Sequence, residues 1–522
     1  MHDRLTGSTE RVNVSATGEQ ANGDSEVASI SADGRHVAFW SEATNLVPGD
    51  TNAAADVFVH DRVAGTTTRV SISSLGEEGD ATSYLPFNMA DARCLSSDGR
   101  FVAFVSGASN LVPNDGSPWD VFVHDRDADE DGIFDETDPG ARRTERIDQG
   151  MFKGPPFGMP GSQEPDGSSG QDGIAITPDG RYVAFTSRAS NLVLDDDVWW
   201  TDVFLRDRQS VWTRRVSVAS NGKEAWGNSV LPVVSADGRY VGCVTAAENL
   251  DAEDTNGMLD VYVHDTKTEQ TVRVSVRSDG SSGSKDNSGG FGCSMSDDGR
   301  FVAFESRAVF EHGDTCCDDV YLHDRDADQD GIFDEPGAIR TTRASKDAAG
   351  GQPDGGSFSP SMSGDGRFLA FSSYASDLVG GDTNGAIDVF LLDRCGDASW
   401  SNYGSGWPGT NGIPALTVSA DPEICTALAL EVGNASGMAT SSVVFLGFTS
   451  VAWSTAWDGT LLAWPSFGLP MSVPAAGQSI GLVLPCDHAL CGLQVFLQQL
   501  QIDPNASKGI SFSDGLQLVV GT

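Results

Sequence analysis

The sequence predicts an all-β protein, built as a six-bladed β-propeller followed by a β-sandwich-like domain. Three observations support this prediction. An Asp-Gly-Arg signature followed by an alternating strand pattern occurs six times between Asp33 and Asp365. The chain holds 60 glycines and few long apolar runs, which favours short strands and tight turns over helices. Near residue 395 the repeats stop and the composition changes, which indicates a second domain over 395–522.

Each repeat is predicted to form four short antiparallel strands. The first ends in Ser-x-Asp-Gly, and the glycine turn leads into the second, as in DGRHVAF at Asp33. The third is typified by DVFVHDR at Asp56, and a further turn leads to the fourth, which ends in RVSV or a close variant. Such a sheet alone has two open edges and too little core. The copies are therefore expected to pack radially over residues 1–394.

The chain begins in the middle of a repeat. Residues 8–15, STERVNVS, match the fourth strand, whereas the sixth repeat leaves at Arg394 without one. We therefore expect the N-terminal strand to complete the last blade, because this closes the ring and removes an open edge. The alternative is a truncated sequence that has lost a signal peptide, or a signal peptide and a seventh blade.

The balance of charged residues limits the classes of partner that the protein can bind. Against 33 basic residues stand 75 acidic ones, and a formal charge of -42 repels phosphate backbones and anionic lipid headgroups. We therefore expect no nucleic-acid partner. No stretch of about 20 apolar residues is present, so no membrane insertion is expected either. The acidity itself is either a solvated surface that keeps a secreted protein soluble, or partly a set of cation ligands.

The nine cysteines fall into groups. Two pairs in the C-terminal part are close enough in sequence to bridge, which would suit an oxidising compartment: Cys395 with Cys425 and Cys486 with Cys491. Three others lie in predicted strands, where a cysteine usually acts as a small apolar filler: Cys94, Cys243 and Cys293.

Units of the form S-x-DGRxVAF…NLVPGDTNxxxDVFVHDRxxGxTxRVSV resemble the TolB-type propeller repeats of secreted and periplasmic bacterial proteins, over roughly residues 1–394. The resemblance implies a propeller fold and a secreted or periplasmic location. It does not specify a function, because propellers serve as binders, scaffolds and enzymes.

Two repeats carry an acidic insert after the third strand, DADEDGIFDETD and DADQDGIFDE. Oxygen ligands at alternate positions and a glycine for the sharp turn suit Ca²⁺, which takes six to eight oxygens. The expected ligands are Asp127, Asp129, Asp131, Ile133, Asp135 and Asp138 in the first loop, and Asp326, Asp328, Asp330, Ile332, Asp334 and Glu335 in the second. The second site is expected to be weaker, because its twelfth position is Gly337.

These inserts resemble the calcium loops of dockerin and thrombospondin type-3 repeats, which implies structural Ca²⁺. The alternative is an acidic hairpin without metal. Three loops between second and third strands could also grip a cation, namely DTNAAAD at Asp50, DTNGMLD at Asp254 and DTNGAID at Asp382. Here ordinary turn chemistry is the stronger interpretation, because Asp and Asn side chains bond nearby backbone amides in such turns.

Large aromatic residues gather in loops on the face of the predicted propeller that lies opposite the two acidic inserts. They are Trp119, Trp199 and Trp200 between second and third strands, Trp226 between blades three and four, and Phe152 and Phe157 in a long connection after blade two. Such a rim could stack sugar rings or receive a partner's side chains. Alternatively, these aromatics pin the long connection to the propeller.

Catalytic motifs are scarce: no G-x-S-x-G elbow, H-E-x-x-H run or phosphate-cradling Gly-Lys motif occurs. Five of the eight histidines share one repeat position, which indicates a structural role: His2, His60, His124, His264 and His323. We therefore expect a binding or scaffold protein for a protein or carbohydrate ligand. The alternative is a propeller enzyme of glycoside hydrolase or lyase type, with its site in the central funnel.

Residues 395–522 show seven short apolar segments separated by Gly, Pro and Asn turns, which favours a β-sandwich. The start YGSGWPGTNGIP and the finish FSDGLQLVVG resemble the C-terminal modules of large secreted bacterial proteins. No chemical motif accompanies this resemblance.

Overall fold

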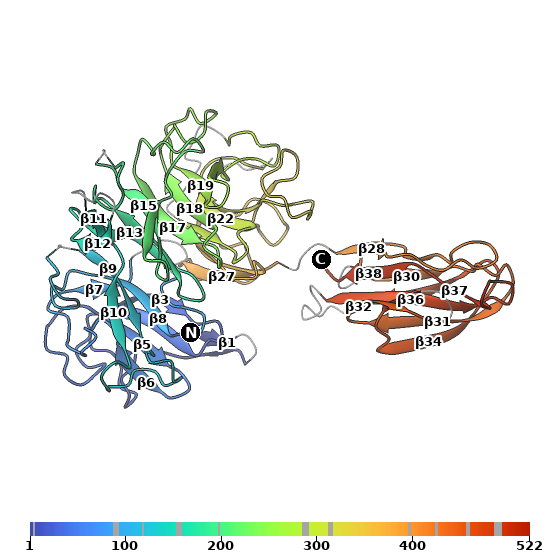
Figure 1. Cartoon of the computed structure of the whole chain (residues 1–522), viewed down its shortest axis with the longest axis horizontal. Coiled ribbons are helices and arrows are strands. Elements are labelled where there is room, and N and C mark those ends of the chain that lie inside the picture. Colours follow the sequence, from blue (N-terminus) through green and yellow to red (C-terminus); the bar gives the residue numbers. More distant parts are fainter. Residues whose placement is uncertain are drawn as a thin grey trace. The chain divides into compact units, whose positions relative to one another are not determined.

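The computed structural model describes residues 1–521 except 4–5, 87–92, 117–118, 153–158, 197–198, 284–291, 312–316, 395–397, 423–425, 456–459 and 485–492. The described residues form strands, turns and loops but no helix, so the all-β prediction is confirmed. Within this part of the chain there is consequently no helix that could cross a membrane. The chain divides into two compact units, Met1–Leu392 and Asp393–Thr522 (Figure 1).

The first unit consists mainly of six antiparallel sheets, in each of which the strands follow one another in chain order. The first three sheets are β3 (Ser25–Ile30), β4 (His36–Ser41), β5 (Asp56–Asp61) and β6 (Thr66–Arg69); β7 (Ser83–Tyr84), β8 (Phe101–Ser106), β9 (Asp120–Asp125) and β10 (Arg143–Arg146); and β13 (Ser169–Ile176), β14 (Tyr182–Ser187), β15 (Asp202–Asp207) and β16 (Trp212–Arg215).

The next three sheets are β17 (Ser229–Val234), β18 (Tyr240–Thr245), β19 (Asp260–Asp265) and β20 (Gln270–Arg273); β21 (Cys293–Met295), β22 (Phe301–Ser306), β23 (Asp319–Asp324) and β24 (Arg340–Arg343); and β25 (Ser357–Met362), β26 (Phe368–Ser373) and β27 (Asp388–Asp393). Two small hairpins accompany them: β1 (His2–Asp3) with β2 (Ser8–Thr9), and β11 (Gly150–Phe152) with β12 (Met159–Gln163).

The Asp-Gly-Arg turns connect the first and second strands within a sheet, and they also contact the neighbouring sheet. The glycine takes a positive φ, 71° at Gly180, and a Cβ there would lie 2.1 Å from Phe101 Cδ2 of the preceding sheet. A side chain is thus excluded both by the backbone conformation and by the close approach. Backbone bonds link consecutive turns, as from Ala32 N to Ser97 O at 2.9 Å and from Ser97 N to Pro178 O at 2.9 Å.

The sheets are arranged radially. First strands of consecutive sheets contact one another, β13 with β17, β17 with β21, and β21 with β25. Arg93, which precedes the second strand of the second sheet, donates to Met295 O of the fifth at 2.9 Å and to Met362 O of the sixth at 3.3 Å. Only a ring of sheets around a common centre brings these three together, which is the β-propeller arrangement.

The cores lie between neighbouring sheets. Third strands such as β5, β9 and β15 are buried along their whole length, and their phenylalanines stack on those of the second strands, as Phe104 does on Phe122 with centroids 5.7 Å apart. The buried positions of Cys94, Cys243 and Cys293 in three of these apolar clusters agree with their predicted role as fillers.

The structure differs from the prediction for residues 8–15. Strand β2 pairs with β1, with His2 opposite Thr9, the same register as His60 opposite Thr67 in β5 and β6. The N-terminal segment brings its own third-strand residues, so its fourth strand pairs locally across a short turn, where loop closure costs least. The described part of the sixth sheet has the three strands β25, β26 and β27.

The sixth sheet is therefore covered on one face only. In β27 half-buried positions alternate with the exposed Val389 and Leu391, whereas β5 is buried throughout. A cavity of about 980 Å³ lies between this sheet and the first, lined among others by Ile30, Phe358 and Leu391, with Arg93 at its wall.

The second unit contains β28 (Ser399–Tyr403), β29 (Leu416–Val418), β30 (Ala427–Val432), β31 (Thr440–Gly447), β32 (Ser450–Ser454), β33 (Thr460–Ala463), β34 (Phe467–Val473), β35 (Gln478–Val483), β36 (Gln494–Ile502), β37 (Ile510–Phe512) and β38 (Gly515–Val519). One sheet has the order β28-β38-β36-β31-β34, with β37 on β36, and a second has the order β29-β30-β35. Leu430 of the second sheet and Val444 and Leu497 of the first share one core, so the two sheets pack as a sandwich. The predicted bridges Cys395 with Cys425 and Cys486 with Cys491 lie outside the described residues.

Candidate functional site

The first acidic insert lies between β9 and β10 and gathers three carboxylates. Asp127, Asp129 and Asp131 bring their oxygens within 4.8 Å of one another. The two oxygens of Asp127 accept the amide hydrogens of Asp131 and Gly132, each at 3.1 Å. Gly132 takes a φ of 84°, which allows the sharp turn. The carboxylates at the first, third and fifth positions of the loop thus lie together, as expected for cation ligands. We call these three carboxylates, and the equivalent three of the second insert, the gathered group of each loop.

The later positions of this loop are arranged differently. Asp135 forms a two-pronged ion pair with the buried Arg126, whose Nε donates to Asp135 Oδ1 at 2.9 Å. Arg126 also donates to Gly99 O at 2.7 Å, which ties the loop to the turn beside it. Asp138 and Ile133 are exposed and are not part of the gathered group. Asp135 is therefore neutralised by arginine.

The second insert, between β23 and β24, repeats this geometry. Its gathered group is Asp326, Asp328 and Asp330, and Asp334 pairs with the buried Arg325 at 2.5 Å. Ile332 is exposed, and Glu335 lies outside the gathered group. In both loops the phenylalanine anchors the insert on the preceding sheet: Phe134 packs on His36, and Phe333 on Tyr240, with ring centroids 5.4 and 5.3 Å apart.

Each insert can bind a hard cation. Three carboxylates this close repel one another, and a cation that takes several oxygen ligands relieves the repulsion. The donors in each gathered group are all carboxylates, which suits Ca²⁺ or Mg²⁺ rather than a soft transition metal.

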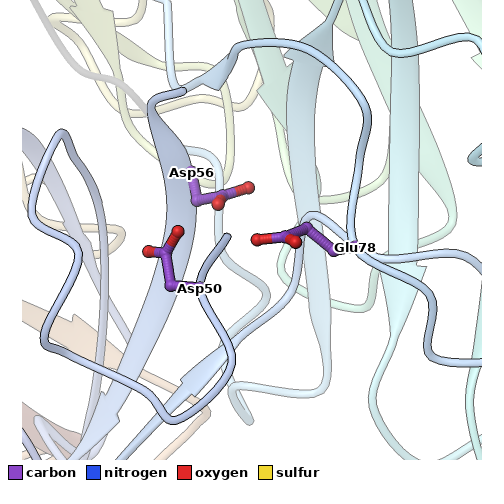
Figure 2. A group of neighbouring side chains, drawn as sticks. All are labelled: Asp50, Asp56 and Glu78. Atoms are coloured by element: carbon purple, nitrogen blue, oxygen red, sulfur yellow. The ribbon is translucent and has the colours of Figure 1, made fainter. Parts of the chain in front are cut away.

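A second kind of acidic cluster lies where third strands begin. In the first sheet it consists of Asp50, Asp56 and Glu78 (Figure 2). The second and third sheets repeat it as Asp115, Asp120 and Glu164, and as Asp196, Asp202 and Glu224. Burial, together with the neighbouring Asp120, raises the pKa of Asp115 to about 7. Burial likewise raises the pKa values of Asp120 and Asp202 to about 7.

Sequence reasoning found these clusters only in part. The DTN pattern marked Asp50, but the corresponding loops of the second and third sheets lack that pattern. The glutamates were missed because they come from the connection to the next sheet. Their signal was present in the sequence, since Glu78 and Glu224 follow Asp56 and Asp202 at the same spacing.

The other two DTN loops show turn chemistry. Asn384 Nδ2 donates to Asp388 Oδ2 at 3.1 Å, and the Asn384 amide lies 3.4 Å from Asp382 Oδ1. In the fourth sheet Asp254 Oδ2 accepts a hydrogen bond from the Tyr262 hydroxyl at 2.8 Å. Among the described residues neither loop gathers three carboxylates.

The predicted aromatic rim separates into packed and exposed members. Trp119 is half-buried against Tyr84, with centroids 5.4 Å apart. Trp199, Trp200 and Trp226 are 91%, 45% and 69% exposed. Phe152 ends strand β11, and Phe157 lies outside the described residues.

The repeated histidines are part of the framework. His124 Nδ1 and His323 Nδ1 lie 2.8 Å from Thr144 Oγ1 and Thr341 Oγ1 of the neighbouring fourth strands. Burial lowers the pKa of both imidazoles to about 4. The cavity between the first and sixth sheets, which we call the central cavity, has no histidine among the described residues that line it. Its Asp297 is paired with Arg93 at 2.5 Å.

No protein-family model matches the chain, and no curated protein matches it. Among solved structures it is similar to a TolB described as putative from Agrobacterium tumefaciens, at 15% identity and a TM-score of 0.31, covering 62% of this chain and 81% of that one. It is also similar to the periplasmic gluconolactonase of Pseudomonas aeruginosa, at 14% identity and 0.28, over 83% and 95% of the two chains. A third is an ancestral GH74 enzyme, at 11% and 0.30, over 95% and 62%. At these values the similarities say nothing about what this chain binds or catalyses.

Proposed function

We propose that the protein is a secreted or periplasmic, calcium-stabilised β-propeller that acts as a binding or scaffold protein for a protein or carbohydrate ligand. The observation that carries the proposal is the exposure of three tryptophans, Trp199, Trp200 and Trp226, on the third sheet. We call these three residues the tryptophan surface.

The tryptophan surface draws on two neighbouring connections. Trp199 and Trp200 lie in the loop from β14 to β15, and Trp226 lies in the connection from β16 to β17. In an antiparallel sheet both connections leave from the same end. The Thr201 amide donates to Asn228 Oδ1 at 2.9 Å, so the two connections are joined.

Exposed indoles at one place favour recognition. A tryptophan offers a large flat apolar face and one N–H donor at low conformational cost, which suits stacking on a sugar ring or insertion into a partner's pocket. Trp119 is packed against Tyr84, which supports a packing role for that residue. Ca²⁺ in the insert loops would hold the framework that presents the surface.

The proposal is tested with glycan and protein arrays, probed with the purified chain in Ca²⁺. The variant carries Trp199→Ala, Trp200→Ala and Trp226→Ala. The matched control is Trp212→Ala, because Trp212 is as exposed as Trp200 at 45% but lies on the outer strand β16.

We expect the wild type and the control to bind a common ligand and the triple variant to lose at least about tenfold in affinity, as truncated interface tryptophans often do. Equal binding by the triple variant would contradict the tryptophan surface. Absence of any binding, together with turnover of a polysaccharide that survives the triple substitution, would favour the enzyme alternative in the central cavity.

A further inference from the structure

We propose that Asp50, Asp56 and Glu78 form a divalent-cation site, separate from the insert loops, and that the second and third sheets repeat it. We call these three clusters the strand-end sites. The expected ion is Ca²⁺, because the donors are carboxylate oxygens and the site is formed by loops. This inference goes beyond the proposed function, since it does not depend on any ligand of the tryptophan surface.

The three carboxylates of the first strand-end site converge from separate segments. Asp56 begins β5, Asp50 precedes it in the loop from β4, and Glu78 follows β6 in the connection to the second sheet. Figure 2 shows the three carboxylate groups directed toward a common space. Their oxygens lie within 4.8 Å of one another.

Two of the carboxylates have ordinary hydrogen-bond partners. Asp56 Oδ1 accepts from the Ser71 hydroxyl at 2.6 Å, and Asp56 Oδ2 accepts from Arg69 Nη1 at 3.0 Å and Asn52 Nδ2 at 3.2 Å. Glu78 Oε1 accepts from Arg69 at 2.5 Å, and Glu78 Oε2 from the Thr51 hydroxyl at 2.7 Å.

Asp50 is the exception. Its side chain is 1% exposed, and neither of its oxygens accepts a hydrogen bond. The nearest guanidinium atom, Arg69 Nη1, is 3.7 Å from Asp50 Oδ1, beyond hydrogen-bond distance. A buried carboxylate without donors is costly, and a bound cation supplies the missing partner.

The balance of charges at the first strand-end site also favours a bound cation. Three carboxylates face the single guanidinium of Arg69, which leaves two negative charges uncompensated if all three are ionised. A divalent cation balances this excess.

The second sheet repeats the unpartnered carboxylate. The side chain of Asp115 is 1% exposed, and neither oxygen accepts a hydrogen bond. The guanidinium of Arg146, equivalent to Arg69, lies 3.5 Å away. Asp120 Oδ1 is likewise buried without a hydrogen-bond partner.

The fourth sheet solves the same problem without a cation. Where the first three sheets have Phe58, Phe122 and Phe204, it has Tyr262, whose hydroxyl donates to Asp254 at 2.8 Å. Where they have a glutamate, it has Ser282, which accepts from Arg273 Nη2 at 3.0 Å. The tyrosine hydroxyl thus gives Asp254 the donor that Asp50 lacks, and the third carboxylate of this sheet, Asp251, pairs with Arg273 at 3.1 Å instead of joining a gathered group.

The chain therefore supplies its own matched variants. Phe58→Tyr with Glu78→Ser gives the first sheet the tyrosine donor and the serine of the fourth sheet. Tyr262→Phe with Ser282→Glu installs the first-sheet arrangement in the fourth. Both pairs exchange residues that the same fold already carries at equivalent positions.

The experiment counts bound Ca²⁺ by equilibrium dialysis with radioactive Ca²⁺. The parent protein carries Asp129→Asn, Asp131→Asn, Asp328→Asn and Asp330→Asn, which remove the gathered groups of both insert loops. We expect the parent to retain about three Ca²⁺ per chain. The Phe58→Tyr/Glu78→Ser variant should retain one fewer, and the Tyr262→Phe/Ser282→Glu variant should bind one more.

A parent that binds no Ca²⁺, or the same count in the parent and both exchange variants, overturns the proposal. If the first-sheet variant does not fold, judged by its circular dichroism, Asp50→Asn and the gain variant decide. Because no ligand of the tryptophan surface is involved, failure here leaves the proposed function untouched, and failure of the array leaves the strand-end sites untouched.

The third strand-end site offers a second readout. Trp199 and Trp200 lie between Asp196 and Asp202 in the chain, and Trp226 follows two residues after Glu224. Tb³⁺, which replaces Ca²⁺ in oxygen sites, should therefore luminesce when these tryptophans are excited. Luminescence that is unchanged by Glu224→Gln would contradict cation binding at the third sheet.

Discussion

At the scale of single residues, the arginines of the Asp-Gly-Arg signatures in the first five sheets each pair with an aspartate of the same sheet. Arg35, Arg181 and Arg239 each place two guanidinium nitrogens on the aspartate that ends the third strand of the same sheet, namely Asp61, Asp207 and Asp265. The Arg181 guanidinium lowers the pKa of Asp207 to about 2, against an ordinary value of 3.8. The signature thus encodes a turn and the ion pair that holds the turn to its sheet.

This ion pair predicts an acid dependence of stability. A carboxylate with a lowered folded-state pKa contributes its stability above pH 3.8, and this contribution is lost as the pH falls toward 2. Replacing Arg181 by Gln should lower the urea midpoint at pH 7 only modestly, because the arginine is partly exposed and solvent screens the pair. The measurement is the urea midpoint at pH 7 and at pH 2.5. A cost that is equal at both pH values would contradict the assignment.

At the scale of elements, each insert loop has two parts. The base is held by an arginine and a phenylalanine, and the tip carries the gathered group of carboxylates. Arg126 and Arg325 hold Asp135 and Asp334 at the base, and Phe134 and Phe333 pack on the preceding sheets. Each tip carries three gathered carboxylates, and within the described part of the chain no arginine forms an ion pair with them. A cation would therefore order the tip while the base stays in place.

Removal of the bound cation by a chelator should destabilise the protein. We expect EDTA to lower the melting temperature of the wild type by about 2–5 °C and added Ca²⁺ to restore it, because a ligand that binds only the folded state stabilises it by mass action. With Asp129→Asn and Asp328→Asn the shift should shrink. Glu136→Gln is the control, since Glu136 lies in the first loop but outside its gathered group. A shift unchanged by the two asparagines would contradict cation binding at the loops.

At the scale of the whole propeller, Arg93 connects sheets that are far apart in sequence. Its guanidinium pairs with Asp297 at 2.5 Å and donates to Met295 O and Met362 O. The second, fifth and sixth sheets are thereby joined at the centre. The first and sixth sheets face each other across the cavity, where Leu391 of β27 is exposed.

Removing this central link should destabilise the propeller unit. Arg93→Met should cost about 2 kcal/mol, because three hydrogen bonds of a charged group are lost and Asp297 is left without its counter-charge. The control is Arg188→Met, since Arg188 is exposed and 3.6 Å from Asp172, and should cost less than about 0.5 kcal/mol. Urea unfolding followed by circular dichroism measures both. Equal costs would contradict the role of Arg93.

The sequence by itself determined the strands, the turns and the repeat, because these depend on neighbouring residues. The short apolar run in DVFVHD, the glycine of each Asp-Gly-Arg turn and the acidic insert loops are all local signals. The gathering of Asp127, Asp129 and Asp131 follows from their alternate spacing in one turn. The division near residue 395 was visible as a change in composition, and the structure divides after Leu392.

The tertiary structure alone decided which distant groups meet. Glu78 reaches Asp50 across a whole hairpin, Arg93 reaches Asp297 across the ring, and Asp135 turns to Arg126 rather than to the loop tip. The pairing of β2 with β1 was likewise undetermined by the repeat, since the same strand pattern suits either a local hairpin or the distant sixth sheet. Local patterns specify elements, whereas contacts between elements depend on the free energy of packing the whole chain.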